Sequence, residues 1–296
     1  MNDQKTLVSI AMITYNHEAY IKQAVEGVLM QECDFEYELV IADDNSPDQT
    51  HDIIQEIVNT HTKAKNIRYT RHEENKGMIR NFIWALNQCK GKYIALCEGD
   101  DYWTDPYKLK KQVNIMETDE NCKICYHRVN VKENENDVSD ENDITEMRFN
   151  KIFDKSNIDI TDLLQLGNFM HTCSVMFRNE IKTYPFEMFK SPIGDYVLYI
   201  LLLKNGGNIK KINESMAYYR RGVGVYSSLS KNATLRKIKE YQTCVLSLLE
   251  NENHRKIMLV KVLKQQENFE KESIIENMPV TKLLSTIFKK VKNKLS

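Results

Sequence analysis

The chain has 296 residues, of which 42% are hydrophobic and 28% charged, and its formal net charge is −1. These values are typical of a globular protein with a sizeable core, and the near-zero charge excludes a global field that attracts nucleic acid. No apolar run approaches the roughly 20 residues of a membrane-spanning helix. A predicted strand follows the N-terminus directly, so we expect no signal peptide.

Seven cysteines are scattered along the chain. Cys122 and Cys125 have the spacing of a metal or redox motif, but they lie inside a predicted strand and have no second pair nearby. We therefore expect neither zinc binding nor redox chemistry at this pair. Reduced thiols fit a cytoplasmic protein.

Short apolar segments alternate with amphipathic ones through the first half of the chain. The apolar segments have the length of strands buried in a sheet, and the amphipathic ones repeat apolar residues at helical spacing. This alternation predicts an α/β fold with a mostly parallel sheet and helices on both faces. Asp48 is expected to cap the second helix, and Asp105, ahead of Pro106, the fourth. The predicted strands in this half are 7–13, 37–42, 67–70, 93–97 and 123–126.

Polar residues follow the first, second and fourth strands, at 14–16, 43–44 and 98–101. Because the carboxyl ends of parallel strands meet at one edge of a sheet, these residues are expected to line one crevice. Glu98, Asp100 and Asp101 repel one another, and a divalent cation with oxygen ligands would compensate them. The alternative is a solvated acidic turn before a helix. Motifs for a dinucleotide fold or a phosphate-binding loop do not occur.

The second half is patterned less regularly. Residues 132–143 are polar and acidic and are expected to form a surface excursion. Strands are predicted at 173–177 and within 209–219, with a buried helix over 197–203. Asp195 precedes that helix, as its N-cap or as an exposed catalytic carboxylate. Residues 220–228 are basic and contain glycine, which is typical of a mobile loop.

From about residue 234 onward the pattern is helical and increasingly basic. Residues 281–296 predict a basic amphipathic helix, which would either rest on an anionic membrane or pack on the domain or a partner subunit. Its apolar face comprises Leu284, Ile287, Phe288, Val291 and Leu295.

Four segments in order, 13–17, 41–48, 75–81 and 97–106, carry a resemblance to glycosyltransferase family 2. The family consists of inverting enzymes with the GT-A fold that use nucleotide-diphosphate sugars, and the resemblance is of the bacterial surface-glycan type. It is strong over 6–127, thinner through 171–176, 194–195 and 219–221, and absent from the last sixty or so residues. It implies a GT-A domain over 1–230, with a nucleotide-binding half (6–127) and an acceptor half (128–230), and a helical extension over 231–296.

The resemblance also implies roles for individual residues. Glu98 stands where the family often has Asp, which leaves its part in the metal site open. Arg220 and Arg221 would close over the diphosphate from a mobile loop, or form a solvated basic turn. His171 is either an acceptor-site residue or a partly buried histidine, and Trp103 packs the acidic loop or floors the acceptor site. The family positions imply Thr14, Tyr15 and Asn16 at the base and ribose, Asp44 at the pyrimidine N–H, Arg80 near the nucleotide, Asp100 at the ribose or sugar and metal, Asp101 on the metal, and Asp195 as catalytic base.

The expected function is transfer of a sugar, with inversion, from a UDP-sugar or a related donor to an acceptor hydroxyl. The acceptor would be a glycan or a lipid-linked glycan in surface polysaccharide synthesis, with Mn²⁺ or Mg²⁺ as cofactor and no nucleic acid partner. The alternatives are a catalytically inactive nucleotide-sugar-binding protein and a nucleotidyltransferase. We expect a cytoplasmic protein, at the inner face of the membrane if 281–296 binds lipid. Whether the protein forms a homo-oligomer stays an open question at this point.

Overall fold

The computed structural model describes residues 6–132, 155, 157–223 and 230–276. Within these residues one mixed sheet has the strand order β3-β2-β1-β4-β7-β6-β8-β5. The strands are β1 (Val8–Thr14), β2 (Tyr37–Asp43), β3 (Ile67–Arg71), β4 (Tyr93–Leu96), β5 (Tyr102–Trp103), β6 (Cys122–Lys132), β7 (Met176–Arg178) and β8 (Asn208–Arg220).

The first half of the sheet is parallel, as the sequence predicts. β1 pairs with β2 and β4, and β2 pairs with β3, all in parallel. The chain runs from β1 outward to β3 and then returns to the other side of β1 with β4. The strand order therefore reverses between β1 and β4, and ligands of open α/β sheets bind at such a reversal. In the second half, β7 is antiparallel to β4 and β6, whereas β6 and β8 are parallel.

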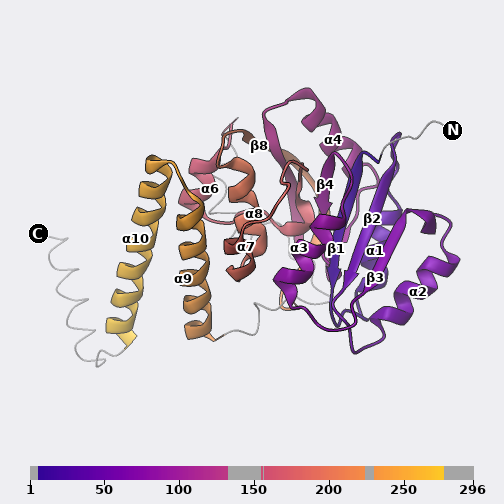
Figure 1. The fold of residues 1–296 in the computed structure, drawn as a ribbon, viewed down its shortest axis with the longest axis horizontal. Helices are drawn as coiled ribbons and strands as arrows, with labels where there is room; N and C mark the ends of the chain where they lie inside the picture. Colours follow the sequence, from indigo (N-terminus) through magenta and orange to yellow (C-terminus); the bar gives the residue numbers. More distant parts are fainter. Residues whose placement is uncertain (1–5, 133–154, 156, 224–229, 277–296) are drawn as a thin grey trace, which may run out of the picture.

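The helices cover both faces of the sheet (Figure 1). On one face, α1, α2 and α4 pack on alternate residues of β1 and β2 such as Ile10 and Ile41. On the other face, α3 and the later helices pack on the residues between them, such as Ala11 and Val40. The helices are α1 (Ile21–Leu29), α2 (Thr50–Thr60), α3 (Met78–Gln88), α4 (Lys108–Thr118), α6 (Ile160–Leu166), α7 (Phe186–Lys190), α8 (Gly194–Leu203), α9 (Lys231–Leu248) and α10 (Glu252–Glu276), with short 3₁₀ turns η1 (Ala64–Asn66) and η2 (Thr172–Ser174).

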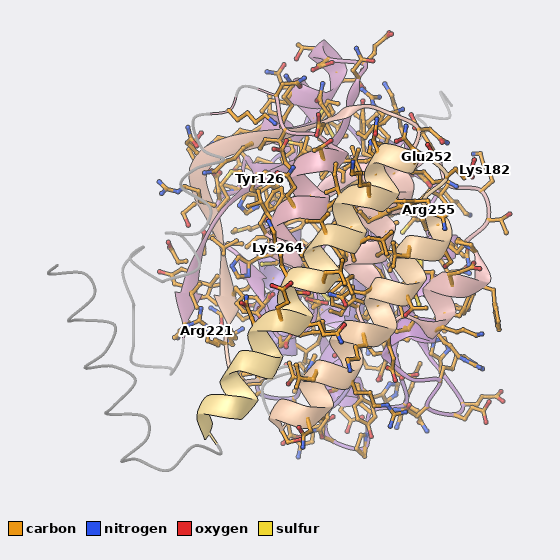
Figure 2. All side chains as sticks on the ribbon, turned by 90° about the vertical axis from the view of Figure 1, so that its left-hand side faces the viewer. Tyr126, Lys182, Arg221, Glu252, Arg255 and Lys264 are labelled. Atoms are coloured by element: carbon orange, nitrogen blue, oxygen red, sulfur yellow. The ribbon has the colours of Figure 1, made fainter. Side chains whose placement is uncertain are left out.

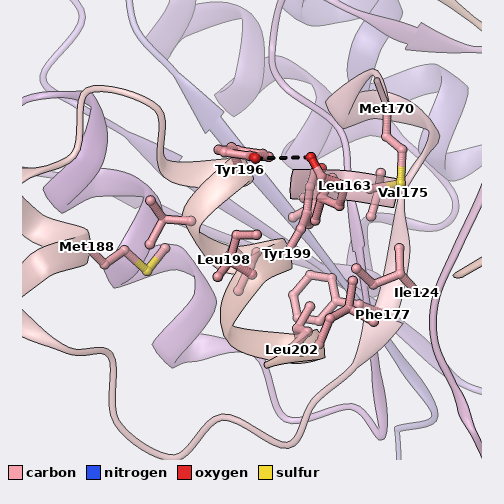
Figure 3. Packing of buried hydrophobic residues seen from close by; sticks show 14 of the residues in the cluster. Ile124, Leu163, Met170, Val175, Phe177, Met188, Tyr196, Leu198, Tyr199 and Leu202 are labelled. Carbon is pink, nitrogen blue, oxygen red and sulfur yellow. Dashed lines mark hydrogen bonds between the residues drawn. The ribbon is translucent and has the colours of Figure 1, made fainter. Parts of the chain in front are cut away.

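Helix α8 lies in the core between the sheet and the helices on the α3 side, and its burial agrees with its apolar sequence. Leu198, Tyr199 and Leu203 are fully buried. The hydroxyl of Tyr196 donates a hydrogen bond of 3.1 Å to the carbonyl of Leu163 in α6, which satisfies the buried phenol (Figure 3). Packing on all sides holds the first turn of α8, which carries Asp195, in a fixed position.

Two predicted helix caps are wrong. Gln49 and Tyr107 are the N-cap residues of α2 and α4. Asp48 instead accepts hydrogen bonds from the backbone N–H groups of Glu18 and Thr50, which joins the loop after β2 to the loop after β1. Asp105 accepts the N–H of Tyr107 and pairs with Lys111. Both carboxylates are used by loop contacts that a local sequence pattern does not contain.

Strand β7 begins three residues later than predicted, because 172–174 form the 3₁₀ turn η2. The predicted excursion at 132–143 and the amphipathic helix at 281–296 lie at or beyond the edge of the described residues, as does most of the loop at 220–228. Among the helices that the structure describes, none has the length and apolar character needed to cross a membrane.

Candidate functional site

Three carboxylates gather where β4 ends. Single ligand atoms from Glu98, Asp100 and Asp101 all lie within 4.8 Å of one another. The loop is pressed against the end of β1, because the N–H of Gly99 donates a 2.9 Å hydrogen bond to the carbonyl of Ile13. A Cβ atom at Gly99 would lie 2.7 Å from the hydroxyl oxygen of Thr14, so only glycine fits this turn. Close backbone contact with β1 thus positions the cluster.

Asp101 is buried, with 1% of its surface exposed, which differs from the solvated acidic turn that was the alternative interpretation of this segment. Its Oδ1 accepts the backbone N–H of Arg220 at 2.8 Å, whereas its Oδ2 has no hydrogen-bond partner among the described residues. Burial, followed by the charge of Asp100, raises the pKa of Asp101 well above its usual value. The pKa of Glu98 is raised well above its usual value by burial and then by Asp100 and Asp101. The Cys173 thiol and the charge of Arg220 lower the pKa of Asp101, but they do not cancel the effect of burial and of Asp100.

Arg220 is part of the wall of the site and not of a mobile loop, contrary to expectation. It is the last residue of β8 and is 4% exposed. Its guanidinium lies 4.8 Å from the ring centre of Tyr20 and 4.7 Å from that of Tyr102. It donates to the carbonyl of Asp100 at 2.6 Å and to the side chain of Gln23. These contacts connect the acidic loop to α1 and β8 through one side chain.

Arg221 follows β8, and its backbone N–H donates to the carbonyl of Lys132. Its side chain is half-buried. The expected closure of this segment over a diphosphate stays a prediction, because residues 224–229 lie outside the described part of the chain.

The other aspartate pair, after β2, is fully bonded within the protein. Asp43 accepts the N–H and the hydroxyl of Ser46 and the hydroxyl of Tyr69. Asp44 accepts the backbone N–H groups of Lys76 at 2.7 Å and Gly77 at 2.9 Å. Asp43 therefore holds a backbone turn. Asp44 fixes the turn before α3, and its oxygens keep further lone pairs for a ligand.

The residues predicted at the base and ribose lie at the end of β1. The backbone carbonyl of Thr14 accepts the N–H of Asp44 at 3.0 Å, which brings the first two motifs together. Tyr15 is 46% exposed. Asn16 has a positive φ of 59° and donates its N–H to Ser46. Arg80 lies exposed in the first turn of α3, and among the described residues its side chain makes no hydrogen bond to this group.

Asp195 lies inside the first turn of α8 and is not its N-cap, which is Ile193. Its Oδ1 accepts the N–H of Tyr196 at 2.8 Å. Its Oδ2 accepts the side-chain amide of Asn168 at 2.6 Å and the hydroxyl of Thr172 at 3.4 Å. Burial raises the pKa of Asp195, and the bond from Asn168 offsets part of that effect. A carboxyl with a raised pKa is better matched to accepting a proton near neutral pH.

Thr172 links the predicted base to the acidic cluster. Its hydroxyl interacts with Asp195 and also with Glu98, where it lowers the raised pKa. The charge of Asp195 in turn raises the pKa of Glu98, which indicates that the two carboxylates lie close together. Sequence reasoning missed Thr172 and Asn168, although both flank His171, which it singled out. The structure also adds His17, whose Nε2 lies 4.0 Å from Asp100 Oδ2.

Two other residues that the sequence singled out have packing contacts. The indole N–H of Trp103 donates to the carbonyl of Cys173 at 2.8 Å, and Trp103 is 2% exposed, so it is a packing residue in this structure. His171 stacks on Tyr219, with ring centres 4.5 Å apart. Cys122 and Cys125 lie buried in β6 as free thiols.

The family model described as "Glycosyl transferase family 2" matches residues 9–184. The chain therefore belongs to glycosyltransferase family 2. An uncharacterized protein of Mycobacterium tuberculosis is 35% identical over 214 residues, which are 72% of this chain and 58% of that protein. The chain thus spans little more than half the length of this relative.

Two further similarities concern a protein with a named activity and a structure with a bound nucleotide. The Escherichia coli enzyme WfaP, a UDP-Glc:alpha-D-GlcNAc-diphosphoundecaprenol beta-1,3-glucosyltransferase, is 29% identical over 255 residues, covering 85% of this chain and 90% of that one. The crystal structure of residues 1–349 of Staphylococcus aureus TarS in complex with UDP has a TM-score of 0.65 and 16% identity, covering 95% of this chain and 78% of that one. The second likeness, at this identity, shows the GT-A fold alone.

Proposed function

We propose that this protein is an inverting, metal-assisted glycosyltransferase that moves a sugar from a nucleoside-diphosphate sugar to an acceptor hydroxyl. The observation that carries the proposal is the pairing of two features at one edge of the sheet. One is the cluster of Glu98, Asp100 and Asp101, in which a buried oxygen of Asp101 has no hydrogen-bond partner in the part of the chain that the structure describes. The other is Asp195, which Thr172 connects to that cluster.

The residues present fit a divalent cation. Buried carboxylates with raised pKa values favour a bound positive charge, and carboxylate oxygens are the ligands that Mg²⁺ and Mn²⁺ prefer. Asp101 and Asp100 would hold the ion, with Glu98 as a third oxygen donor. When bound, such an ion supplies positive charge that stabilises a diphosphate leaving group.

Asp195 would act as general base. The acceptor oxygen attacks the anomeric carbon from the side opposite the diphosphate and forms the new C–O bond. The bond from that carbon to the diphosphate oxygen breaks, and its electron pair stays on the diphosphate. The acceptor proton passes to Asp195. Asn168 holds one carboxylate oxygen of Asp195 at 2.6 Å, which fixes the orientation of the base.

The donor is proposed to be a UDP-sugar. The relative WfaP is named for UDP-Glc, and the TarS structure holds UDP. Thr14, Tyr15 and Asn16 at the end of β1 and Asp44 beside them would receive the nucleoside, with Arg80 and Arg221 near the phosphates. The acceptor is proposed to be a lipid-linked or free glycan of surface polysaccharide synthesis, in line with the diphosphoundecaprenol acceptor in the name of WfaP.

Asp195→Asn tests the proposal, because asparagine keeps the shape of the side chain but cannot take a proton. Transfer should fall by about 10²–10⁴-fold, while the affinity for UDP with Mn²⁺ should change little. The measurement is release of UDP from UDP-sugars with an acceptor glycan, with binding by calorimetry. Asp162→Asn is the control, since Asp162 lies in the capping box of α6, and its transfer rate should stay normal. Normal transfer by Asp195→Asn would reject Asp195 as the base.

A further inference from the structure

Helix α10 carries apolar side chains on two sides. On its inner side Met258 is fully buried, and Ile257 and Val262 pack against the core that also contains α6 and α9. On its outer side Leu259 is 47% exposed and Leu263 is 59% exposed. The inner residues account for the packing of the helix, and the outer ones have no role in the fold.

The outer apolar residues form one stripe, which we call the α10 stripe: Leu259, Val260 and Leu263. Residues at spacings of three and four lie side by side on a helix surface, so these three are contiguous. They make up three of the eight large hydrophobic side chains that are exposed among the described residues. Figure 2 views this side of the molecule, with α10 in front of the other elements.

Cations frame the α10 stripe. Arg255 and Lys256 lie one helical turn before Leu259 and Val260, and Lys264 lies one turn after Val260. Figure 2 labels Arg255 and Lys264 on α10, and the exposed Glu267 is an acidic neighbour one turn beyond Leu263. All three cations are exposed, and none of them forms an ion pair with another described residue. An exposed apolar stripe bordered by lysine and arginine is the surface of a helix that lies in the interface of an anionic bilayer.

We infer that the α10 stripe and its flanking cations are a docking surface for an anionic lipid bilayer. The side chains of Leu259, Val260 and Leu263 enter the boundary between headgroups and acyl chains, and Arg255, Lys256 and Lys264 contact the lipid phosphates. This surface belongs to a helix that is also part of the folded core, because Met258 of the same helix is fully buried.

The sequence beyond α10 favours a bilayer over a second copy of the chain as the occupant. Residues 277–296 contain five lysines and no acidic residue. Near the surface of an anionic membrane each such cation contributes about 1 kcal/mol of attraction. Against a second copy of the same segment, these like charges would repel.

The docking surface also lies close to the proposed base. A Cβ atom at Gly167, at the end of α6, would lie 3.0 Å from Nζ of Lys261 on α10. The next residue, Asn168, donates to Asp195. When α10 is docked, the acceptor side of the site would therefore lie near the bilayer. The separation would be a few helix diameters, and one helix diameter is about 10–12 Å. This last consequence, access to a lipid-linked acceptor, rests on the proposed function.

Vesicle co-sedimentation of the full chain tests the inference, with phosphatidylglycerol–phosphatidylcholine vesicles compared with pure phosphatidylcholine vesicles. We expect binding to the anionic vesicles that weakens as salt rises. The double variant Leu259→Ser/Leu263→Ser should bind at least about tenfold more weakly with unchanged melting temperature. Tyr107→Ser is the matched control, because Tyr107 is an equally exposed apolar residue beside α4 on the opposite face of the sheet.

Equal binding of the double variant and the wild type would overturn the inference, as would absence of wild-type binding to anionic vesicles. A concentration-dependent dimer that the double variant loses, without vesicle binding, would assign the stripe to a subunit interface and also overturn it. Vesicle binding requires neither donor nor acceptor. Its failure would therefore leave sugar transfer intact, and loss of transfer in Asp195→Asn would leave vesicle binding intact.

Discussion

Two pairs of adjacent aspartates lie at the same edge of the sheet, yet the protein treats them differently. Asp43 and Asp44 follow β2, and every one of their carboxylate oxygens accepts a hydrogen bond from a described residue. Asp100 and Asp101 follow β4. Asp101 Oδ2 is buried without a hydrogen-bond partner among the described residues, and the carboxylates of Glu98 and Asp100 lie beside it. The charge of Arg220 offsets only part of the resulting rise in the pKa of Asp101.

The difference shows why an Asp-Asp pair is not a metal site in itself. A carboxylate whose oxygens are satisfied by backbone N–H groups and hydroxyls holds loops in place. A buried carboxylate that lacks donors is unfavourable until a cation or a proton arrives. The first pair therefore holds the loops at this edge of the sheet in place, and the second favours the binding of an additional positive charge there.

Removal of Asp43 should have the largest effect on stability. Asp43→Ala leaves the N–H and hydroxyl of Ser46 and the hydroxyl of Tyr69 without their acceptor in a buried place. We expect a loss of about 3–4 kcal/mol in the free energy of unfolding, measured by urea denaturation. The metal dependence of UDP binding should persist below the melting temperature.

Asp52→Ala is the matched control for this change, because Asp52 lies exposed in the first turn of α2. Asp52→Ala should lower the free energy of unfolding by less than about 1 kcal/mol. If Asp43→Ala is as mild as this control, or removes the metal dependence without loss of stability, then the contrast between the two aspartate pairs is wrong.

A smaller effect is expected at Arg220. Arg220→Lys keeps the backbone N–H to Asp101 but loses the planar contacts with Tyr20 and Tyr102 and the bond to Asp100. The free energy of unfolding should fall by about 1–3 kcal/mol, and the Kd for Mn²⁺ should rise several-fold because the acidic loop is less well fixed. Arg236→Lys on the exposed side of α9 should change neither quantity. An unchanged Kd for Mn²⁺ would limit Arg220 to a role in folding.

The sequence was informative where the determining pattern is local. Apolar runs that end in Thr14, Asp43 and Glu98 predicted both the strands and the edge at which the site lies. The bonds that decide the chemistry are not local. Arg220 and Asp101 are 119 residues apart, and Asn168 and Asp195 are 27 apart. Burial of Asp101 and fixation of Arg220 depend on such contacts, which is why both were predicted as parts of exposed or mobile loops.

The caps predicted at Asp48 and Asp105 failed for the same reason, since each carboxylate is used by a neighbouring loop or side chain. Asn168 and Thr172 have no signature in one sequence. They become partners of Asp195 because the segment between α6 and η2, together with η2, packs against the start of α8.

The claim that Asp101 binds a cation is tested most directly by comparing the melting temperatures of the wild type and of Asp101→Asn. Asparagine keeps the acceptor for Arg220 and removes the buried charge. Burial raises the pKa of Asp101, so this group makes the metal-free wild type less stable as pH rises through that pKa, and the variant lacks this contribution. At pH 7.5 without metal, Asp101→Asn should melt at the same temperature as the wild type or higher.

On addition of UDP with Mn²⁺, the wild type should gain several degrees and the variant should gain none beyond the shift seen with UDP and a chelator. A full Mn²⁺-dependent shift in Asp101→Asn would contradict the account, as would a metal-free variant that melts well below the wild type.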